Sequence, residues 1–252
     1  MAEGKAPRRL VAGNWKMNGL TASLAEVRAL KAALSGRNVG ASVAVCPPAT
    51  LLAAASGELR GTGILSGGQD CHPEPFGAFT GDISAEMLAD AGASMVILGH
   101  SERRHGLHES DELVARKVNA ARRAGLVPIV CVGETEGERD SGKTLDIVGR
   151  QLTHSLAASL DATALVIAYE PVWAIGSGRV PSNDDIEAVH GFIRSELGKR
   201  FGSAGADVAI LYGGSVKPTN AGEILKLKDV GGALVGGASL KAADFLKIIE
   251  AA

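Results

Sequence analysis

Short, unbroken apolar runs recur along the chain, each followed by a Gly- or Pro-marked turn and then by a longer segment of helical period. Continuous hydrophobicity is typical of strands buried on both faces, as in a parallel sheet covered by helices. Eight strand–helix units fit a closed barrel better than an open, doubly wound sheet. We therefore predict an α/β fold, a parallel eight-stranded (β/α)8 barrel surrounded by helices. The runs are residues 10–12, 42–46, 63–66, 95–98, 127–132, 164–168, 207–211 and 233–235.

Segments of helical period lie between the runs, most clearly at residues 23–34, 111–124, 183–200 and 242–251. Asn183 is a candidate cap for the third of these, and the acidic residues that follow it suit the positive end of the helix dipole. Since no linker, low-complexity tract or repeat interrupts the chain, we predict that residues 1–252 form a single domain.

Composition and charge exclude several functional classes. The 252 residues carry a formal net charge of −2, which provides no electrostatic basis for binding nucleic acid or an anionic membrane. The apolar stretch 41–55 is interrupted by two prolines and is too short to span a bilayer. The first nine residues do not resemble a signal peptide. The three cysteines match no zinc-binding spacing and suggest free thiols in a reducing compartment. These features predict a cytoplasmic protein without a bound metal.

Polar residues follow several of the predicted strands where each strand ends. Asn14 and Lys16 follow the first run, His100 the fourth and Glu170 the sixth. Each has an ordinary alternative, such as a solvated lysine or a histidine that caps a helix. However, barrel active sites lie at the carboxyl ends of the strands, so these residues are expected to share one rim.

Two glycine pairs follow the seventh and eighth runs. They are Gly213-Gly214, followed by Ser215, and Gly236-Gly237. Glycine lets backbone N–H groups approach a ligand closely, and loops after these two strands often bind phosphate in such barrels. Lys16 is the candidate cation for the phosphate. A carboxylate base and an imidazole then remain, a pair suited to moving a proton at a carbon next to a carbonyl.

The segment after Glu170 has the composition of a hinged lid. A stiff Pro-Val-Trp comes first and is followed by the small residues of 174–178. Rigid flanks around a loose tip suit a loop that moves as a unit. The alternative is an ordinary exit from a strand with a solvated glutamate.

Seven motifs, in order and spread over residues 9–250, resemble those of the triosephosphate isomerase family, whose members have the TIM-barrel fold. The resemblance implies interconversion of dihydroxyacetone phosphate and D-glyceraldehyde 3-phosphate through an enediolate, in glycolysis and gluconeogenesis, without any cofactor. The motifs are 13–18 (GNWKMN), 77–81 (GAFTG), 98–104 (LGHSERR), 131–134 (CVGE), 169–176 (YEPVWAIG), 212–216 (YGGSV) and 235–240 (VGGASL).

The resemblance also implies roles for individual residues. Glu170 would be the general base, His100 a neutral electrophile whose pKa the following helical turn keeps low, and Lys16 the group that stabilises negative charge. Asn14 would position Lys16 and contact the substrate. Residues 174–179 would form the lid, and the phosphate would be held by Gly176, Ser215, Gly236 and Gly237.

The segment 71–82 resembles the long loop that enters the neighbouring subunit in this family, which implies a homodimer. Two residues depart from the usual pattern: Asp70 stands where Asn is common, and Asp82 where Glu is common.

Three other functions remain open at this point. A four-carbon sugar phosphate could be the substrate of the same mechanism. A barrel that binds a phosphorylated ligand without catalysis, or that acts as an adhesin at the cell surface, is a second possibility. A phosphate-binding barrel synthase or aldolase is a third, although an aldolase needs a Schiff-base lysine or a metal, and no predicted strand offers one.

Overall fold

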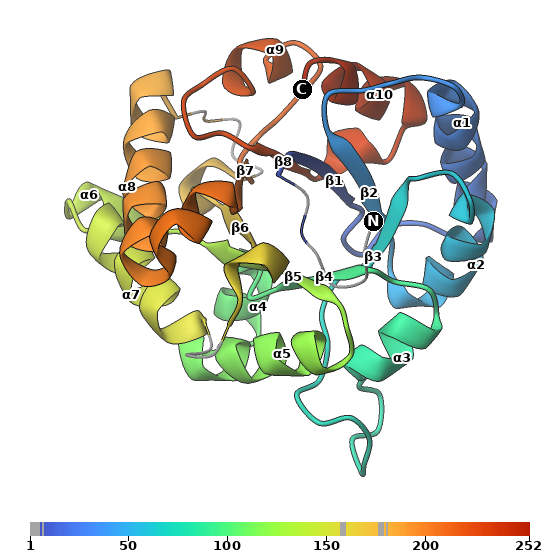
Figure 1. Cartoon of the computed structure of the whole chain (residues 1–252), viewed down its shortest axis with the longest axis horizontal. Helices are drawn as coiled ribbons and strands as arrows, with labels where there is room; N and C mark the ends of the chain where they lie inside the picture. The colour runs from blue at the N-terminus through green and yellow to red at the C-terminus, as the bar shows by residue number, and fades with distance from the viewer. Residues whose placement is uncertain (1–5, 7, 157–159, 176–178, 180) are drawn as a thin grey trace.

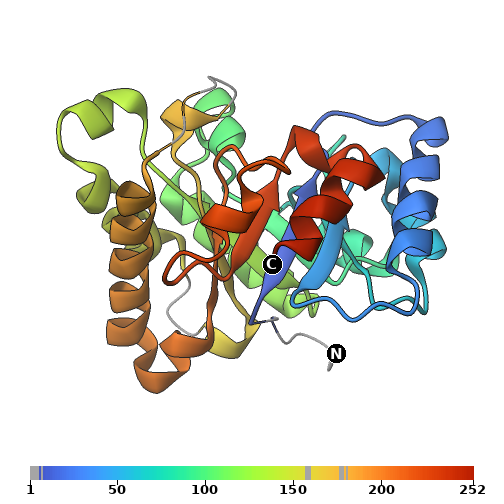
Figure 2. The same ribbon diagram turned by 90° about the horizontal axis from the view of Figure 1, so that it is seen from above.

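Eight parallel strands form a closed barrel in which each strand pairs with the next and the last pairs with the first. The computed structural model describes residues 6, 8–156, 160–175, 179 and 181–252. Figure 1 looks down the barrel, and Figure 2 shows its helices along the outside of the strands. The predicted (β/α)8 architecture is confirmed. The strands are β1 Leu10–Asn14, β2 Ser42–Cys46, β3 Leu65–Gly68, β4 Met95–Leu98, β5 Val127–Val132, β6 Val166–Tyr169, β7 Ala209–Tyr212 and β8 Gly232–Val235.

Helices cover the outer face of the barrel and bury the outward-pointing half of each strand. The four predicted helical segments appear with ends within one residue of those expected. The helices are α1 Leu24–Leu34, α2 Ala49–Leu59, α3 Ala85–Asp90, α4 Ser101–Gly106, α5 Asp111–Arg123, α6 Glu136–Asp140, α7 Thr144–Ser155, α8 Asn183–Phe201, α9 Ala221–Ile224 and α10 Ala242–Glu250.

Successive side chains of each strand point into two different apolar layers, which explains why the strands are hydrophobic along their whole length. In β6, Val166 and Ala168 point into the barrel, whereas Ile167 and Tyr169 pack against the surrounding helices. Because side chains alternate along a strand, both faces need apolar residues when both are buried.

β3 lies two residues further along than the apolar run predicted. It ends in Gly67 and Gly68, which carry no apolar side chain. A Cβ on Gly67 would lie 2.7 Å from Sγ of Cys46, and one on Gly68 would lie 2.6 Å from a methyl group of Leu88. Neighbouring side chains fill the space, so a larger residue at either strand position would have to displace them.

The cap of α8 is also one residue earlier than predicted. Ser182, not Asn183, is the N-cap: its side chain accepts a hydrogen bond from the Asp185 N–H, and Asp185 bonds back to it. This reciprocal capping box satisfies two otherwise unpaired donors. Asn183 instead donates to Glu223 Oε1 at 2.6 Å.

The buried His190 on α8 is expected to make the stability of the protein depend on pH. The side chain is fully buried beside Tyr169, and burial lowers its pKa to about 4. The unfolded chain therefore binds one more proton than the folded chain between about pH 4 and the ordinary histidine value of about 6.5. This group consequently makes the protein less stable as the pH falls through that range.

We expect His190→Leu to remove a slope of up to about 1.4 kcal/mol per pH unit from the free energy of unfolding between pH 6 and 4.5. Urea unfolding of both proteins at several pH values measures the difference between their slopes, in which the contributions of other groups cancel. Parallel curves would show that His190 does not cause the dependence.

Candidate active site

A cavity of about 440 Å³ opens at the carboxyl ends of the strands. The alternation of side chains along each strand determines which residues face the cavity. Val166 and Ala168 point into the barrel, so Glu170 is the next inward position after β6. The same alternation directs Asn14, the last residue of β1, inward, since Leu10 and Ala12 point into the barrel. The lining residues are Asn14, Lys16, Asn18, His100, Glu170, Ile175, Gly213, Gly214, Ser215, Val216, Lys217, Leu234, Gly236, Gly237 and Ala238.

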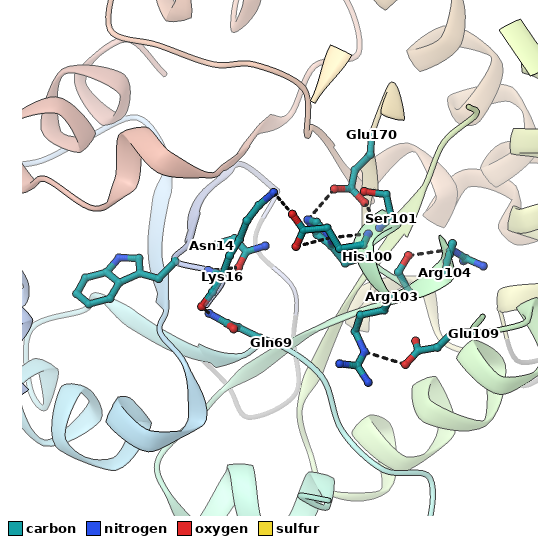
Figure 3. Close-up of polar contacts among 12 residues, drawn as sticks. Asn14, Lys16, Gln69, His100, Ser101, Arg103, Arg104, Glu109 and Glu170 are labelled. Carbon is teal, nitrogen blue, oxygen red and sulfur yellow. Dashed lines mark hydrogen bonds and ion pairs between the residues drawn. The ribbon is translucent and has the colours of Figure 1, made fainter. Parts of the chain in front are cut away.

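Glu170 is buried and held by two donors. Its Oε1 lies 2.9 Å from Nε2 of His100, and its Oε2 accepts a hydrogen bond of 2.9 Å from the N–H of Ser101 (Figure 3). A Cβ on Gly213 would lie 2.9 Å from Cγ of Glu170, so this glycine leaves room for the side chain. Burial raises the pKa of Glu170, but His100 and the Ser101 amide outweigh burial and lower it overall. The carboxylate is therefore in its basic form at neutral pH.

His100 caps the N-terminus of α4, and this cap specifies its tautomer. Its Nδ1 accepts a hydrogen bond of 3.2 Å from the N–H of Glu102. The proton of the neutral ring therefore lies on Nε2, where it is donated toward Glu170. Nε2 is thus a hydrogen-bond donor at the cavity wall.

The pKa of His100 is raised, whereas the helix terminus alone was expected to keep it low. Burial lowers the pKa of His100, but the adjacent carboxylate of Glu170 outweighs burial, and the net direction is upward. The reason is direct contact between the carboxylate and the ring. If a substrate separated these two side chains, burial and Lys16 would lower the pKa of the ring, while the carboxylate of Glu102, 3.7 Å from Nδ1, would still raise it.

Lys16 lies in the loop after β1. Its N–H donates to Oδ1 of Asn14 at 3.0 Å, which is the positioning contact expected for Asn14. Its Nζ forms an ion pair of 2.5 Å with Oε1 of Glu102 (Figure 3). Sequence reasoning did not identify this partner. The only local signal is that Glu102 occupies the first turn of α4, directly after the His100 cap.

The two glycine pairs have different surroundings: protein atoms crowd the first pair, whereas the second borders open space. A Cβ on Gly214 would lie 2.2 Å from the hydroxyl oxygen of Tyr212, so packing within the protein excludes it. A Cβ on Gly237 would meet no described atom within 4 Å, and one on Gly236 would approach only Cε of Lys16, at 3.6 Å. Both face the open cavity. The space beside Gly236 and Gly237 is therefore available to a ligand.

Two further expectations concern the phosphate site and the lid. Ser215 lines the cavity as predicted, and Lys217, which the sequence reasoning did not single out, lines it as well. Gly176 and most of the expected lid tip lie outside the described residues. The stiff segment before the tip forms a short 3-10 helix, Val172–Ala174, in which Trp173 Nε1 donates to Glu134 Oε1 at 2.8 Å.

Over the described residues, no group of three or more His, Cys, Asp or Glu side chains could hold a metal ion. No helix in that part of the chain has both the length and the apolar character needed to cross a bilayer.

Comparison with known proteins identifies the family. The sequence profile of the triosephosphate isomerase family matches residues 9–252. The triosephosphate isomerase of Rhodopseudomonas palustris is 60% identical over 246 residues, which cover 96% of this chain and 97% of the relative. The chain belongs to the triosephosphate isomerase family. The triosephosphate isomerase of Xanthobacter autotrophicus is 58% identical over 245 residues, covering 97% of this chain and 96% of the relative.

The likeness extends to the solved fold. The crystal structure of the triosephosphate isomerase of Bartonella henselae superposes with a TM-score of 0.91, at 52% identity and over 97% of this chain and 98% of that one. Members of this family are isomerases that interconvert dihydroxyacetone phosphate and D-glyceraldehyde 3-phosphate, a step of glycolysis. That interconversion is the activity of this chain.

Proposed function

We propose that the chain interconverts dihydroxyacetone phosphate and D-glyceraldehyde 3-phosphate with Glu170 as base, His100 as electrophile and Lys16 as the stabilising cation. The observation that carries this assignment is the direct contact of Glu170 with Nε2 of His100 at the wall of the cavity. A basic carboxylate and a neutral N–H donor at one point can act on adjacent carbons of a small ketose.

The proposed reaction moves one proton between two carbons. Glu170 removes a proton from C1 of dihydroxyacetone phosphate, the C1–H electron pair forms the C1=C2 bond, and the C2=O π pair moves onto O2 to give an enediolate. The Nε2–H of His100 donates to the enediolate oxygens and passes a proton to O2 as the ring takes up the hydroxyl proton of O1, while the ammonium of Lys16 offsets the negative charge. The protonated Glu170 then returns its proton to C2 as the C1=O bond forms, which yields the aldehyde. Each step conserves atoms and charge.

The phosphate is proposed to lie against the glycine loops. Asn14, Lys16, Ser215, Gly236 and Gly237 line the cavity, and the open space at the two glycines supports this placement. Gly176, expected in the lid, completes the proposed set of binding residues but lies outside the described residues.

Gly237→Val tests the placement of the phosphate. The new side chain would project into space that is free of protein atoms, so folding is expected to be unaffected. Because a bulky group there blocks the phosphate, we expect KM to rise by about 10- to 100-fold, the range seen when a steric or hydrogen-bonding match is lost. The measurement is steady-state kinetics with glyceraldehyde 3-phosphate. A parental KM would place the phosphate elsewhere.

A coupled assay tests the function and the choice of substrate. We expect fast conversion of glyceraldehyde 3-phosphate and slow conversion of a four-carbon ketose phosphate by the same preparation. Efficient turnover of only the four-carbon compound would change the substrate but keep the mechanism. Inactivity toward both would leave a barrel that binds phosphorylated ligands without catalysis.

We also propose that the protein is a homodimer whose contact includes the loop 71–82. This loop extends away from the barrel wall between β3 and α3 (Figure 1) and carries two exposed phenylalanines, Phe76 at 80% and Phe79 at 42% exposure. Exposed aromatic side chains on a protruding loop support burial against another copy of the chain.

Phe76→Asp is expected to shift the protein from dimer toward monomer, because it places a charge in the proposed contact. Sedimentation velocity over a dilution series measures the shift. Leu145→Asp is a matched control, since it replaces another exposed apolar residue at a distance from the loop, on α7. A dimer equally sensitive to both substitutions, or to neither, would contradict the proposed contact.

A cytoplasmic location and a single domain complete the proposal. All three cysteines are free and buried, which suits a reducing compartment. The strands of the barrel come from the whole span between residues 10 and 235, which favours one folding unit for residues 1–252.

A further inference from the structure

Lys16 has a backbone conformation that few residues with a side chain adopt. Its φ is +53°, in the left-handed region. For a residue with a Cβ this region is unfavourable, and it persists only where the surrounding structure holds the backbone in place. Since Lys16 also lines the substrate cavity, the contacts that hold its backbone determine where its ammonium group can reach.

Gln69 holds the carbonyl side of Lys16. Its Nε2 donates to the carbonyl oxygen of Lys16 at 2.9 Å and to that of Cys46 at 2.8 Å. A primary amide nitrogen carries two protons, so both bonds can form at once. Figure 3 shows the Gln69 side chain pointing toward the Lys16 backbone.

These bonds connect three neighbouring strand ends. Gln69 directly follows β3, Cys46 is the last residue of β2, and Lys16 lies just after β1. On its other side, the Lys16 N–H is bound by Asn14 Oδ1. Side-chain amides therefore fix the peptide groups on both sides of the Lys16 Cα, and with them the direction of its Cα–Cβ bond.

We propose that Gln69 is a positioning residue that aims the Lys16 ammonium into the cavity by holding the left-handed backbone of Lys16. This inference rests on the role proposed above for Lys16. Gln69 does not line the cavity of about 440 Å³, although it borders an adjoining one of about 270 Å³ together with Lys16 and His100, and its two hydrogen bonds assign it a role through Lys16 and not on the substrate. Loss of its two bonds frees the Lys16 peptide to leave the left-handed region and carries the ammonium away from the ligand.

The first test is Gln69→Met, which keeps an unbranched side chain of similar length and removes both donors. We expect kcat/KM to fall by about 10- to 100-fold, because displacing a charged group by about 1 Å has effects of this size. A fall in kcat is expected to account for most of the loss, since the proposed cation offsets negative charge that develops on the enediolate oxygens. A parental kcat/KM and kcat would overturn the inference.

A double-mutant cycle separates positioning from general support of the fold. If Gln69 acts through Lys16, Gln69→Met has little further effect in a Lys16→Met background, so the two losses do not multiply. Gln151→Met is the matched control: this side-chain amide also makes two backbone bonds, both to Gly133. The fold losses of kcat/KM caused by Gln151→Met and by Lys16→Met are expected to multiply in the double mutant. Multiplicative losses for Gln69 as well would overturn the inference.

Gln69→Glu adds a readout that a purely structural role would not produce. The introduced carboxyl can donate to a carbonyl only when protonated, and its ionised form repels both carbonyl oxygens. We therefore expect kcat/KM of this variant to fall, relative to the parent, as the pH rises through the pKa of the introduced group. A constant ratio to the parent across pH would count against positioning.

Failure of the inference can be told apart from failure of the proposed function. A Lys16→Met protein with parental activity would overturn the role of Lys16 itself. An inactive Lys16→Met protein beside a fully active Gln69→Met protein would leave that role intact and overturn only the positioning by Gln69. Thermal unfolding of each variant shows whether the compared proteins are folded.

Discussion

Glu170→Gln is expected to lower kcat by about 10³- to 10⁴-fold, the upper part of the range for a positioned general base. The amide has nearly the shape of the carboxylate and cannot accept the substrate proton. KM is expected to change little, because Glu170 is proposed to act on the reacting carbons and not on the phosphate. The measurement is the coupled assay, with exchange of the C1 proton for solvent deuterium as a second readout.

Glu170→Asp provides a graded control for this prediction. It keeps the base but withdraws it by one methylene group, so an intermediate loss is expected. If Glu170→Gln were as active as Glu170→Asp, Glu170 would not be the base. In the parent, kcat/KM is expected to fall as the pH falls through the pKa of Glu170, which lies below the ordinary glutamate value.

His100→Asn is expected to lower kcat by about 10²- to 10³-fold, the usual loss when one donor to a developing oxyanion is removed. The shorter amide cannot place its N–H where Nε2 of the imidazole donates. Asparagine is nevertheless a favourable N-cap, so it can still accept from the Glu102 N–H and preserve α4. The loss should therefore appear in turnover and not in stability.

Thermal unfolding is the control for His100→Asn. A parental midpoint together with the loss of kcat would assign the effect to the missing Nε2–H. A kcat within about threefold of the parent would show that the imidazole is not the electrophile, since removing a working oxyanion donor costs far more. A loss of activity that follows a loss of folded protein would instead point to the helix cap.

Much of the fold follows from the sequence, because a barrel strand buried on both faces must be apolar along its length. Seven of the eight apolar runs give good positions for their strands. The shift at β3 arises because the strand ends in Gly67 and Gly68, where side chains of other elements, Cys46 and Leu88, occupy the space that a Cβ would need. No local pattern of hydrophobicity carries that information.

The sequence by itself also singled out Glu170, His100, Lys16 and the glycine loops as candidates, because strand ends and glycine pairs mark the rim of a barrel, and all of them line one cavity. Only the tertiary structure decided how these residues meet. Ser101 and Glu170 are 69 positions apart, yet a backbone amide of one binds the carboxylate of the other. Lys16 pairs with Glu102, 86 positions away, and its strained backbone depends on Gln69. Contacts of this kind depend on barrel closure and strand register, which bring the ends of separate strands together, and so they cannot be read from neighbouring residues in the chain.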